Sequence, residues 1–359
     1  ELKNFTETAR ALEGSRLGQD LFNLIENFPG PTLCFVEGFC LGGGLELSLA
    51  CKYRVALDSP KTKIGLPEIL LGVQPGWGGS IRLPKLIGSL KALELIIAGK
   101  IVDARTAYKL GIVDAAVPER QLLIAIEYYL SGAAPVKQAG KLERFIQLSF
   151  MRALISKIFK YQVAKKVAAR YYPAPFAVID AWVNNSIYSP QAMQAEAESI
   201  GKLMVTPTAR NLVRVFFLRD RLKAFAKAAK FTPQHVHVVG AGVMGGDIAA
   251  WCALSGFTVT VQDQYLPAIA ATLKRAQQLF SKKLKLPYLV QAARDRLMPD
   301  IDGLGIAKAD VIIEAIIENA QAKQDLFTLL ETKAKPNAIL ATNTSTIPLA
   351  TIGVNLKNP

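Results

Sequence analysis

A glycine-rich turn followed by a glutamate is the first group of residues in this sequence that could do chemistry. Gly42, Gly43 and Gly44 precede a short helical stretch, and Glu46 lies in its first turn. Glycines leave backbone N–H groups unobstructed, and a helix N-terminus adds positive potential at the same place. Such a corner can stabilise an oxyanion that develops on a carbonyl group. The simpler alternative is a tight packing turn between a strand and a helix.

A second carboxylate follows at Glu68, and a further glycine turn over residues 75–79 contains Gly76. If Glu46 and Glu68 meet near the glycine corner, one can act as a base and the other as an acid. Such a pair suits the addition of water to an activated double bond, provided that the two pKa values differ. The spacing alone does not show that they meet, and both could be surface residues.

A GxGxxG motif is the second group of residues with chemical potential. It consists of Gly240, Ala241, Gly242, Val243, Met244 and Gly245. The motif follows a predicted strand, Val236–Val239, and begins a helix, and Asp263 ends the next strand 18 residues after Gly245. This is the context in which a dinucleotide pyrophosphate binds at a helix N-terminus. The Asp263 carboxylate would accept from the ribose hydroxyls and repel a 2′-phosphate, so NAD is favoured over NADP.

Metal binding is not expected, because the residues that ligate metals are scattered. The only two histidines, His235 and His237, alternate on a predicted strand without a carboxylate or cysteine cluster beside them. The four cysteines do not form a CxxC pair, and each has apolar neighbours; they are Cys34, Cys40, Cys51 and Cys252. Buried free thiols in a reducing compartment are the favoured interpretation.

The positive charge of this 359-residue chain is concentrated in its middle. Of the formal net charge of +14, most comes from residues 137–230, which contain 17 Lys and Arg against 5 Asp and Glu. A solvated helical face is the simplest explanation; contact with a phosphate-bearing ligand, an acidic partner subunit or a membrane surface are alternatives. A nucleic-acid partner is not expected, because no binding motif accompanies the charge.

The pattern of apolar residues divides the chain into three regions. We expect an α/β domain over residues 1–126, a basic helical linker over residues 127–231, and a doubly wound nucleotide-binding domain over residues 232–359. No run of uncharged apolar residues is long enough to span a membrane. The predicted strands are Pro31–Glu37, Tyr53–Leu57, Val236–Val239, Thr258–Gln262, Val311–Ala315 and Ala338–Ala341. The predicted helices are Ala9–Asn27, Leu45–Cys51, Lys91–Ala98, Ala104–Leu110, Leu142–Arg170, Phe176–Asn185, Gln191–Met204, Thr208–Lys230, Asp247–Ser255 and Ala320–Lys333.

The first region resembles the crotonase (enoyl-CoA hydratase/isomerase) superfamily. The matching segments are residues 38–51, 63–68, 71–72, 75–76, 78–79, 82–84 and 111–114. The resemblance implies a partial crotonase (ClpP/crotonase-like) β-β-α spiral, with Gly43 donating an amide to a thioester oxyanion. It implies Glu46 and Glu68 as the catalytic pair, Gly76 as a residue that positions water, and Glu68 as the residue for any Δ3–Δ2 isomerase activity. Trp77 stands where relatives often have a small residue, and the family's other oxyanion amide would precede Glu1.

The last region resembles 3-hydroxyacyl-CoA dehydrogenases. The matching segments are residues 240–246, 310–319 and 341–345. The resemblance implies a Rossmann-like domain in which Glu318 and Lys323 lie near NAD, Asn343 lies near its nicotinamide end, and Ser345 bonds the substrate hydroxyl. The family's catalytic histidine would follow Pro359, so the expectation is NAD binding without oxidation of the hydroxyacyl substrate by this stretch alone.

Hydratase-like first and dehydrogenase-like second is the order in multifunctional β-oxidation enzymes, including α-subunits of trifunctional complexes. The resemblance implies acyl-CoA substrates and a thiolase β-subunit as a candidate partner in a hetero-oligomer. The positive charge of the linker leaves peripheral membrane association as a further alternative. The resemblance also implies a chain truncated at both ends, located in the cytoplasm of a bacterium or, alternatively, in mitochondria or peroxisomes. Two rivals remain: another crotonase-type chemistry fused to an NAD domain, and a non-catalytic NAD- and CoA-binding fragment.

Overall fold

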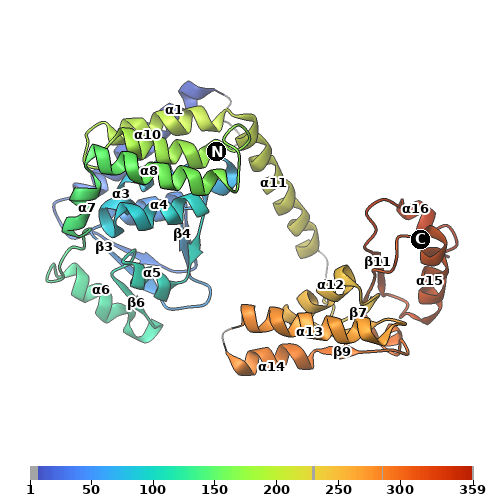
Figure 1. The fold of residues 1–359 in the computed structure, drawn as a ribbon. Coiled ribbons are helices and arrows are strands. Elements are labelled where there is room, and N and C mark those ends of the chain that lie inside the picture. Colours follow the sequence, from blue (N-terminus) through green and yellow to red (C-terminus); the bar gives the residue numbers. More distant parts are fainter. Residues whose placement is uncertain (1–6, 229–230, 285, 358–359) are drawn as a thin grey trace. The chain divides into compact units, whose positions relative to one another are not determined.

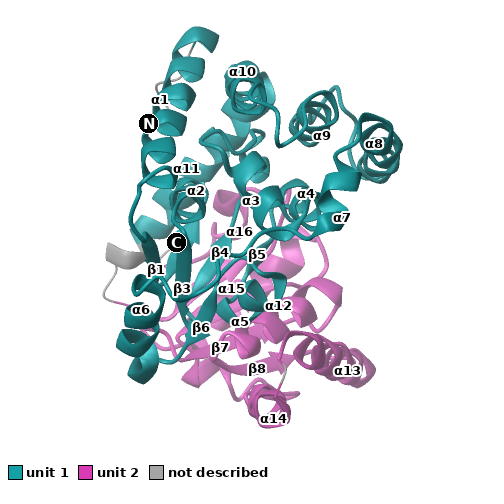
Figure 2. Ribbon diagram, turned by 90° about the vertical axis from the view of Figure 1, so that its left-hand side faces the viewer, with its two compact units in different colours: residues 1–227 teal, residues 228–359 magenta. Residues whose placement is uncertain are grey.

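The chain folds into two compact units, residues 1–227 and 228–359, in a computed structural model that describes residues 7–228, 231–284 and 286–357 (Figures 1 and 2). Both units combine parallel strands with helices, as the alternating apolar pattern predicts. None of the helices in the described ranges is long and apolar enough to cross a membrane.

Two small sheets form the centre of the first unit. One is parallel, with the order β1-β3-β6; the other has the order β2-β4-β5, in which only β5 is antiparallel. The strands are β1 (Leu33–Val36), β2 (Phe39–Leu41), β3 (Tyr53–Leu57), β4 (Lys63–Gly65), β5 (Ile101–Val102) and β6 (Ala115–Val117). Four of these strands have only two or three residues each: β2, β4, β5 and β6. Such short strands show too little apolar periodicity to be predicted from the sequence.

Helices surround these sheets and carry the candidate site. The α-helices before residue 131 are α1 (Thr8–Glu26), α2 (Gly43–Ala50), α3 (Gly79–Ile87), α4 (Ser89–Ala98), α5 (Ala104–Leu110) and α6 (Leu122–Leu130), with 3-10 turns η1 (Glu68–Leu71) and η2 (Glu119–Gln121). One buried core joins both sheets to α2, α3 and α4, and its members include Val36, Leu45, Ile64 and Ile96. This core holds the ends of β2 and β4 next to the start of α2, where the candidate residues lie.

The middle segment is part of the first unit rather than a separate linker. Its helices are α7 (Lys141–Ile146), α8 (Ser149–Ala164), α9 (Ala174–Asn184), α10 (Ala192–Met204) and α11 (Pro207–Ala228). The long helix predicted over residues 142–170 is the pair α7 and α8, and the end predicted for α11 at Lys230 lies outside the described residues. Figure 1 shows α10 beside α1, with which it makes extensive contacts.

Buried polar contacts explain why this charged segment packs so closely. Glu143 accepts from the backbone N–H of Ser89 at 2.8 Å and so caps α4 from outside that helix. Gln147 and Trp182 each donate to the Ser89 hydroxyl, at 2.8 and 3.1 Å. Breaking this network would leave buried polar groups unpaired, so the middle segment stabilises the first unit.

The second unit is a parallel five-stranded sheet with the order β11-β10-β7-β8-β9. Its strands are β7 (His235–Val239), β8 (Thr258–Gln262), β9 (Leu297–Pro299), β10 (Val311–Glu314) and β11 (Ile339–Thr342). Its helices are α12 (Val243–Leu254), α13 (Leu266–Lys283), α14 (Pro287–Asp295), α15 (Ala320–Lys333) and α16 (Leu349–Ile352), with the 3-10 turn η3 (Ile306–Lys308). The order reverses between β7 and β10, which is the switch point where doubly wound sheets bind nucleotides.

Candidate functional sites

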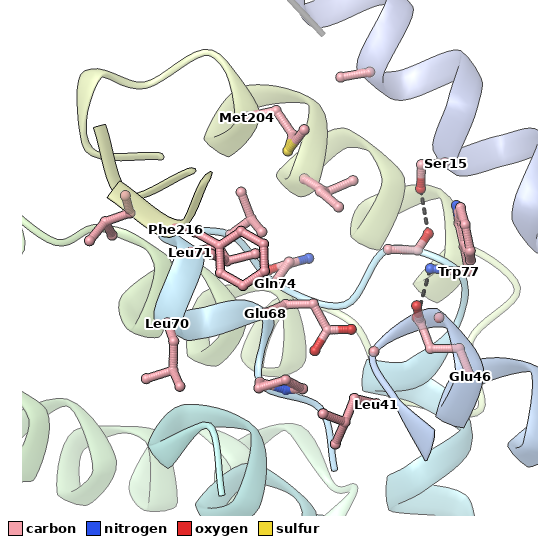
Figure 3. Close-up of a pocket in the computed structure, with 18 of the residues that line it drawn as sticks. Ser15, Leu41, Glu46, Glu68, Leu70, Leu71, Gln74, Trp77, Met204 and Phe216 are labelled. Carbon is pink, nitrogen blue, oxygen red and sulfur yellow. Dashed lines mark hydrogen bonds between the residues drawn. The ribbon is translucent and has the colours of Figure 1, made fainter. Parts of the chain in front are cut away.

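The two candidate carboxylates of the first unit face one cavity. Glu46 and Glu68 both line a space of about 690 Å³, and Figure 3 shows both carboxyl groups pointing into it. Glu46 comes from the first turn of α2 and Glu68 begins η1, so the strand pair β2 and β4 brings them together. The same cavity is lined by Gly43, Gly76 and Trp77. The structure therefore brings these predicted residues together at one cavity.

The surroundings of the two carboxylates differ. Oε1 of Glu46 accepts two backbone N–H groups, from Trp77 and Gly79, both at 2.8 Å. Both oxygens of Glu68 are buried without a hydrogen-bond partner among the described residues. Burial raises the pKa of Glu68 to about 7. Burial and the nearby carboxylates Glu196 and Glu68 raise the pKa of Glu46, whereas its two N–H donors oppose that rise.

The glycine corner has the features of an oxyanion site. Gly43 is the first residue of α2, where backbone N–H groups have no partner inside the helix. Gly42, which precedes it, has φ +56°, a conformation that favours glycine. A Cβ on Gly43 would lie 2.5 Å from the Trp77 ring, so any side chain here would force the indole or the helix to shift. The N–H of Gly43 is therefore held at the cavity, next to the two carboxylates.

Trp77 shapes one wall of this cavity. Its indole N–H donates to the Gly14 carbonyl on α1 at 3.3 Å, and its ring packs edge-on against Phe22 at a centroid distance of 5.7 Å. Gly18 of α1 must lack a side chain because a Cβ there would lie 2.3 Å from the indole. Trp77, which stands where relatives often have a small residue, thus fills the space between Gly18 of α1 and Gly43 of α2.

Most of the remaining cavity lining is apolar, with Ser15, Gln74 and Arg219 as polar members. Leu70 and Leu71 contribute from η1, and Ile101 contributes from β5. Further lining comes from the middle segment, through Ile200, Met204, Leu212, Val215 and Phe216, with Arg219 as the lining cation there. Sequence reasoning missed this contribution of α10 and α11. The apolar periodicity of these helices was visible, but not the element they would pack against.

Glu196 is a buried carboxylate next to this site that sequence reasoning overlooked. It lies on α10 and is completely buried, and it accepts from the backbone N–H of Gly78 at 2.6 Å and of Ser80 at 3.0 Å. A signal was present, because Glu196 lies four residues from Ala192 and from Ile200 and so shares the apolar face of its helix.

In the second unit the GxGxxG loop lies at the switch point, between β7 and α12. Gly240 has φ +104°, and a Cβ on it would lie 2.5 Å from the Ala315 carbonyl; one on Gly245 would lie 1.9 Å from the Gly240 carbonyl. A Cβ on Gly242, by contrast, would meet nothing within 4 Å. Two glycines thus allow close packing and the third leaves open space at the start of α12, which fits a dinucleotide pyrophosphate.

The other predicted cofactor residues surround this loop. Val243 and Met244 are the exposed first residues of α12. Asp263, after β8, accepts from the N–H of Ala241 at 2.7 Å, so its carboxylate is fixed beside the glycine loop. The histidines lie earlier, on β7, where burial lowers the pKa of His237.

Glu318, Asn343 and Ser345 follow β10 and β11 at the same sheet edge. Glu318 accepts from the hydroxyl of Thr344 at 2.5 Å and from the N–H of Ser345 at 3.3 Å. These donors lower the pKa of Glu318 to about 2. The N–H of Asn343 donates to the Glu314 carbonyl at 2.8 Å, which ties the two strand ends together.

Lys323 lies beside Glu318, the other residue that the resemblance places near the cofactor. It is completely buried, and its ammonium lies 2.6 Å from Glu314 and 3.4 Å from Glu318. Because a buried ammonium with two carboxylate partners has no free surface for a ligand, Lys323 anchors Glu318 from behind. Glu314, also buried, was missed because it reads as part of an apolar strand.

Together, the fold and these sites define a crotonase-like domain followed by a Rossmann-like NAD-binding domain. Residues 2–152 match the model of the enoyl-CoA hydratase/isomerase family, and residues 235–359 match that of the 3-hydroxyacyl-CoA dehydrogenase NAD-binding domain. Among curated proteins, the fatty acid oxidation complex subunit alpha of Shewanella loihica is 35% identical over 98% of this chain. The chain spans about half (51%) of that relative's length.

Two of the solved structures similar to part of this chain are dehydrogenases. The 3-hydroxybutyryl-CoA dehydrogenase of Escherichia coli is 32% identical, with 36% of this chain and 28% of that chain covered and a TM-score of 0.35. The dehydrogenase part of multifunctional enzyme 1 from C. elegans is 25% identical, with 36% and 30% covered and a TM-score of 0.33. The chain is similar to about half of an oxidation-complex α subunit and joins a hydratase/isomerase-family domain to an NAD-binding dehydrogenase-family domain, as predicted.

Proposed function

We propose that this chain acts in fatty-acid β-oxidation, hydrating trans-2-enoyl-CoA to 3-hydroxyacyl-CoA in its first unit. The observation that carries this proposal is the pair of buried carboxylates, Glu46 and Glu68, that face one apolar cavity beside the N-terminus of α2. The second unit would serve the next step, the NAD-dependent oxidation of the hydroxyl to a ketone, in the whole protein. The order of the two family domains in this chain, and its similarity to a fatty acid oxidation complex subunit, support this sequence of reactions.

In this mechanism Glu46 is the base and Glu68 is the acid. The two N–H groups on Glu46 stabilise its carboxylate form, and Glu68 has none, so burial favours its protonated form. Glu46 takes a proton from water while the water oxygen bonds to C3, and electrons move onto the thioester oxygen, where the Gly43 N–H stabilises them. Glu68 then gives its proton to C2, and Gly76 helps to position the water. The product is a 3-hydroxyacyl thioester. One hydrogen of the water remains on the new hydroxyl group, and the other passes from Glu46 back to Glu68, which restores both carboxyl groups.

The apolar part of the cavity suits a fatty acyl chain. Leucine, isoleucine, methionine and phenylalanine side chains line it, and they would exclude water from the acyl tail. We propose that α10 and α11 form the acyl-facing wall, so residues 127–227 belong functionally to the first domain. Arg219 is the lining residue placed to attract a negatively charged part of the substrate.

For the second unit we propose that NAD binds across Gly240, Gly242 and Gly245, at the start of α12. The ribose hydroxyls would bond Asp263, and the nicotinamide end would approach Asn343. NAD supplies, when bound, an acceptor for the hydride that leaves C3 of the substrate. Ser345 would orient the substrate hydroxyl, and Lys323 would position Glu318 beside it through their ion pair.

The hydratase assignment is tested with crotonyl-CoA and a longer 2-enoyl-CoA. We expect hydration by the wild-type chain, and a loss of at least about 100-fold in kcat for Glu46→Gln and for Glu68→Gln. Glu198→Gln is the matched control, because Glu198 is an exposed glutamate that bonds only Gln194 on its own helix. Wild-type chain without hydratase activity, or full activity in both variants, would overturn the assignment.

Isomerisation of Δ3- to Δ2-enoyl-CoA is a second candidate activity, favoured by the unpaired Glu68. A carboxyl with a pKa of about 7 in an apolar cavity can remove a proton from one carbon and return it to another. The expected pattern is that Glu68→Gln abolishes isomerisation and Glu46→Gln retains it. Equal loss in both variants would contradict a single-carboxylate shuttle.

We also propose that the protein acts in the bacterial cytoplasm and has a thiolase subunit as a partner. We further propose a peripheral contact with an anionic membrane surface. Support for the membrane contact comes from α7 and α8, where exposed apolar side chains lie among lysines and arginines. The exposed apolar residues include Phe145, Phe150, Leu154 and Ile158. Co-sedimentation with anionic and neutral vesicles tests the membrane contact, and equal binding to both would reject the charge-based explanation.

A further inference from the structure

The loop over residues 76–80 is held between two buried carboxylates that lie on different helices. The backbone N–H groups of Trp77 and Gly79 donate to Glu46, whereas those of Gly78 and Ser80 donate to Glu196. Successive amides of one short loop thus alternate between a proposed catalytic glutamate on α2 and a glutamate on α10. Any movement of Glu196 must therefore move the donors that orient Glu46.

We propose that Glu196 is a positioning residue for the hydration reaction: it fixes the loop that orients Glu46 and places Gly76 at the cavity. This inference rests on the proposed hydratase function and deepens it. Glu196 does not line the acyl cavity, so it acts through the loop and not on the substrate itself.

Three further side chains complete the clamp around this loop. Ser15 and Gln19 of α1 both donate to the Gly76 carbonyl, and Gln19 also donates to Glu196 at 3.1 Å. From the other side, Arg82 donates to the Trp77 carbonyl at 2.7 Å and is itself held by Glu26 of α1 at 2.8 Å. Elements from three parts of the sequence converge on five loop residues, as expected where a catalytic group must be held within a fraction of an ångström.

The charge of Glu196 gives the clamp a second effect on Glu46. The nearby carboxylate of Glu196 raises the pKa of Glu46, and Glu68 adds to this rise. Arg82 and its partner Glu26 are the other charged groups that face the loop. Burial raises the pKa of Glu196 as well, but donors from Ser80, Gln19 and Gly78 oppose that rise and favour its charged form. Glu46 is thereby made a stronger base than the same carboxylate without this neighbour.

The test uses Glu196→Gln in the full chain, which keeps the size of the side chain but removes its charge and one acceptor. We expect kcat for 2-enoyl-CoA hydration to fall about 10- to 100-fold with KM changed less than about threefold. The acidic limb of the kcat profile should move to lower pH, because Glu46 loses a repelling neighbour and ionises more easily. Glu198→Gln, two residues away and exposed, should change neither quantity.

A measurement without turnover separates this inference from the hydratase assignment. Carbon-13 NMR titration of the Glu46 carboxyl should give a lower pKa in Glu196→Gln than in wild type. If the Glu46 pKa differs between the two chains in this way but the wild-type chain hydrates nothing, the proposed function is rejected. Glu196 then remains the group that positions Glu46 and raises its pKa. Wild-type hydration with unchanged kcat, pH profile and Glu46 titration in Glu196→Gln would overturn the inference.

A variant that fails to fold still leaves a test. Ser80→Ala and Gln19→Met each remove one side-chain donor from Glu196 and leave the carboxylate in place. Lower kcat at nearly unchanged KM in these variants supports the positioning role. Wild-type kcat in both, with thermal unfolding temperatures also unchanged, would contradict it.

Discussion

The two glutamates of the proposed hydratase site show how the same side chain acquires different properties from its neighbours. Glu46 receives two backbone N–H groups, and Glu68 receives none although both of its oxygens are buried. An unpaired buried carboxyl costs folding free energy once it ionises, and such a cost is tolerated where function requires it. Glu68 should therefore be a site where activity and stability conflict.

We predict that Glu68→Gln stabilises the first unit at alkaline pH. The pKa of Glu68 is about 7 in the folded chain and near the ordinary glutamate value of 4.5 when unfolded. The folded state therefore favours the protonated form, and the cost of ionisation grows as pH rises from 4.5 to 7. Urea unfolding should show little difference between variant and wild type at pH 4.5, and a gain of about 3 kcal/mol for the variant at pH 8.

The same titration has a control in an exposed residue. Glu198→Gln should leave the free energy of unfolding unchanged at both pH values, because its carboxylate is exposed in both states. A Glu68→Gln chain that is less stable than wild type at pH 8 would show that Glu68 contributes a favourable interaction when ionised.

At the scale of elements, the start of α2 and the loop before α3 depend on each other. The side chain of Trp77 projects from that loop and packs against Gly43 on α2 and Gly18 on α1. The large side chain at position 77 therefore packs in the space that two separate glycines leave open, and the three residues form one packing arrangement. Glycine at position 43 is needed here for space, in addition to any role of its amide.

We predict that Gly43→Ala destabilises the first unit by about 1–3 kcal/mol, although alanine is the better helix former. The added methyl group would lie 2.5 Å from the Trp77 ring, so ring or helix must shift. In a double-mutant cycle measured by urea unfolding, Trp77→Leu should remove most of the penalty of Gly43→Ala. Additive effects of the two substitutions would contradict direct contact between these positions.

At the scale of the whole molecule, the chain consists of two units with separate hydrophobic cores. The first carries the carboxylate pair and the apolar cavity, and the second carries the glycine loop at the switch point of its sheet. Because each proposed site is built within one unit, a ligand of one site should act on the stability of that unit.

We predict that NAD raises the unfolding temperature of the second unit and leaves that of the first unchanged. At a concentration of 100 times its Kd, NAD should add about 2.7 kcal/mol to the stability of the unit that binds it. Calorimetry of the full chain with and without NAD should show one of two transitions moving. NADP at the same concentration should have a smaller effect because Asp263 would repel its 2′-phosphate; equal effects would contradict the role given to Asp263.

The sequence by itself determined the features that depend on neighbouring residues. The glycine corner before Glu46, the GxGxxG loop between strand and helix, and Asp263 at the end of the next strand are local patterns, and local backbone geometry follows from them. The helices of the middle segment were predicted for the same reason, because apolar periodicity is a property of a single element.

Only the tertiary structure decided which of these parts meet. Glu46 bonds a loop 31 residues away, and Glu196 bonds the same loop across 118 residues. Helical periodicity shows which face of α10 is buried but not which partner covers it, so neither the third carboxylate nor the wall from α10 and α11 could be derived. Contacts across such separations depend on how all the elements pack into one core, which no stretch of sequence specifies alone.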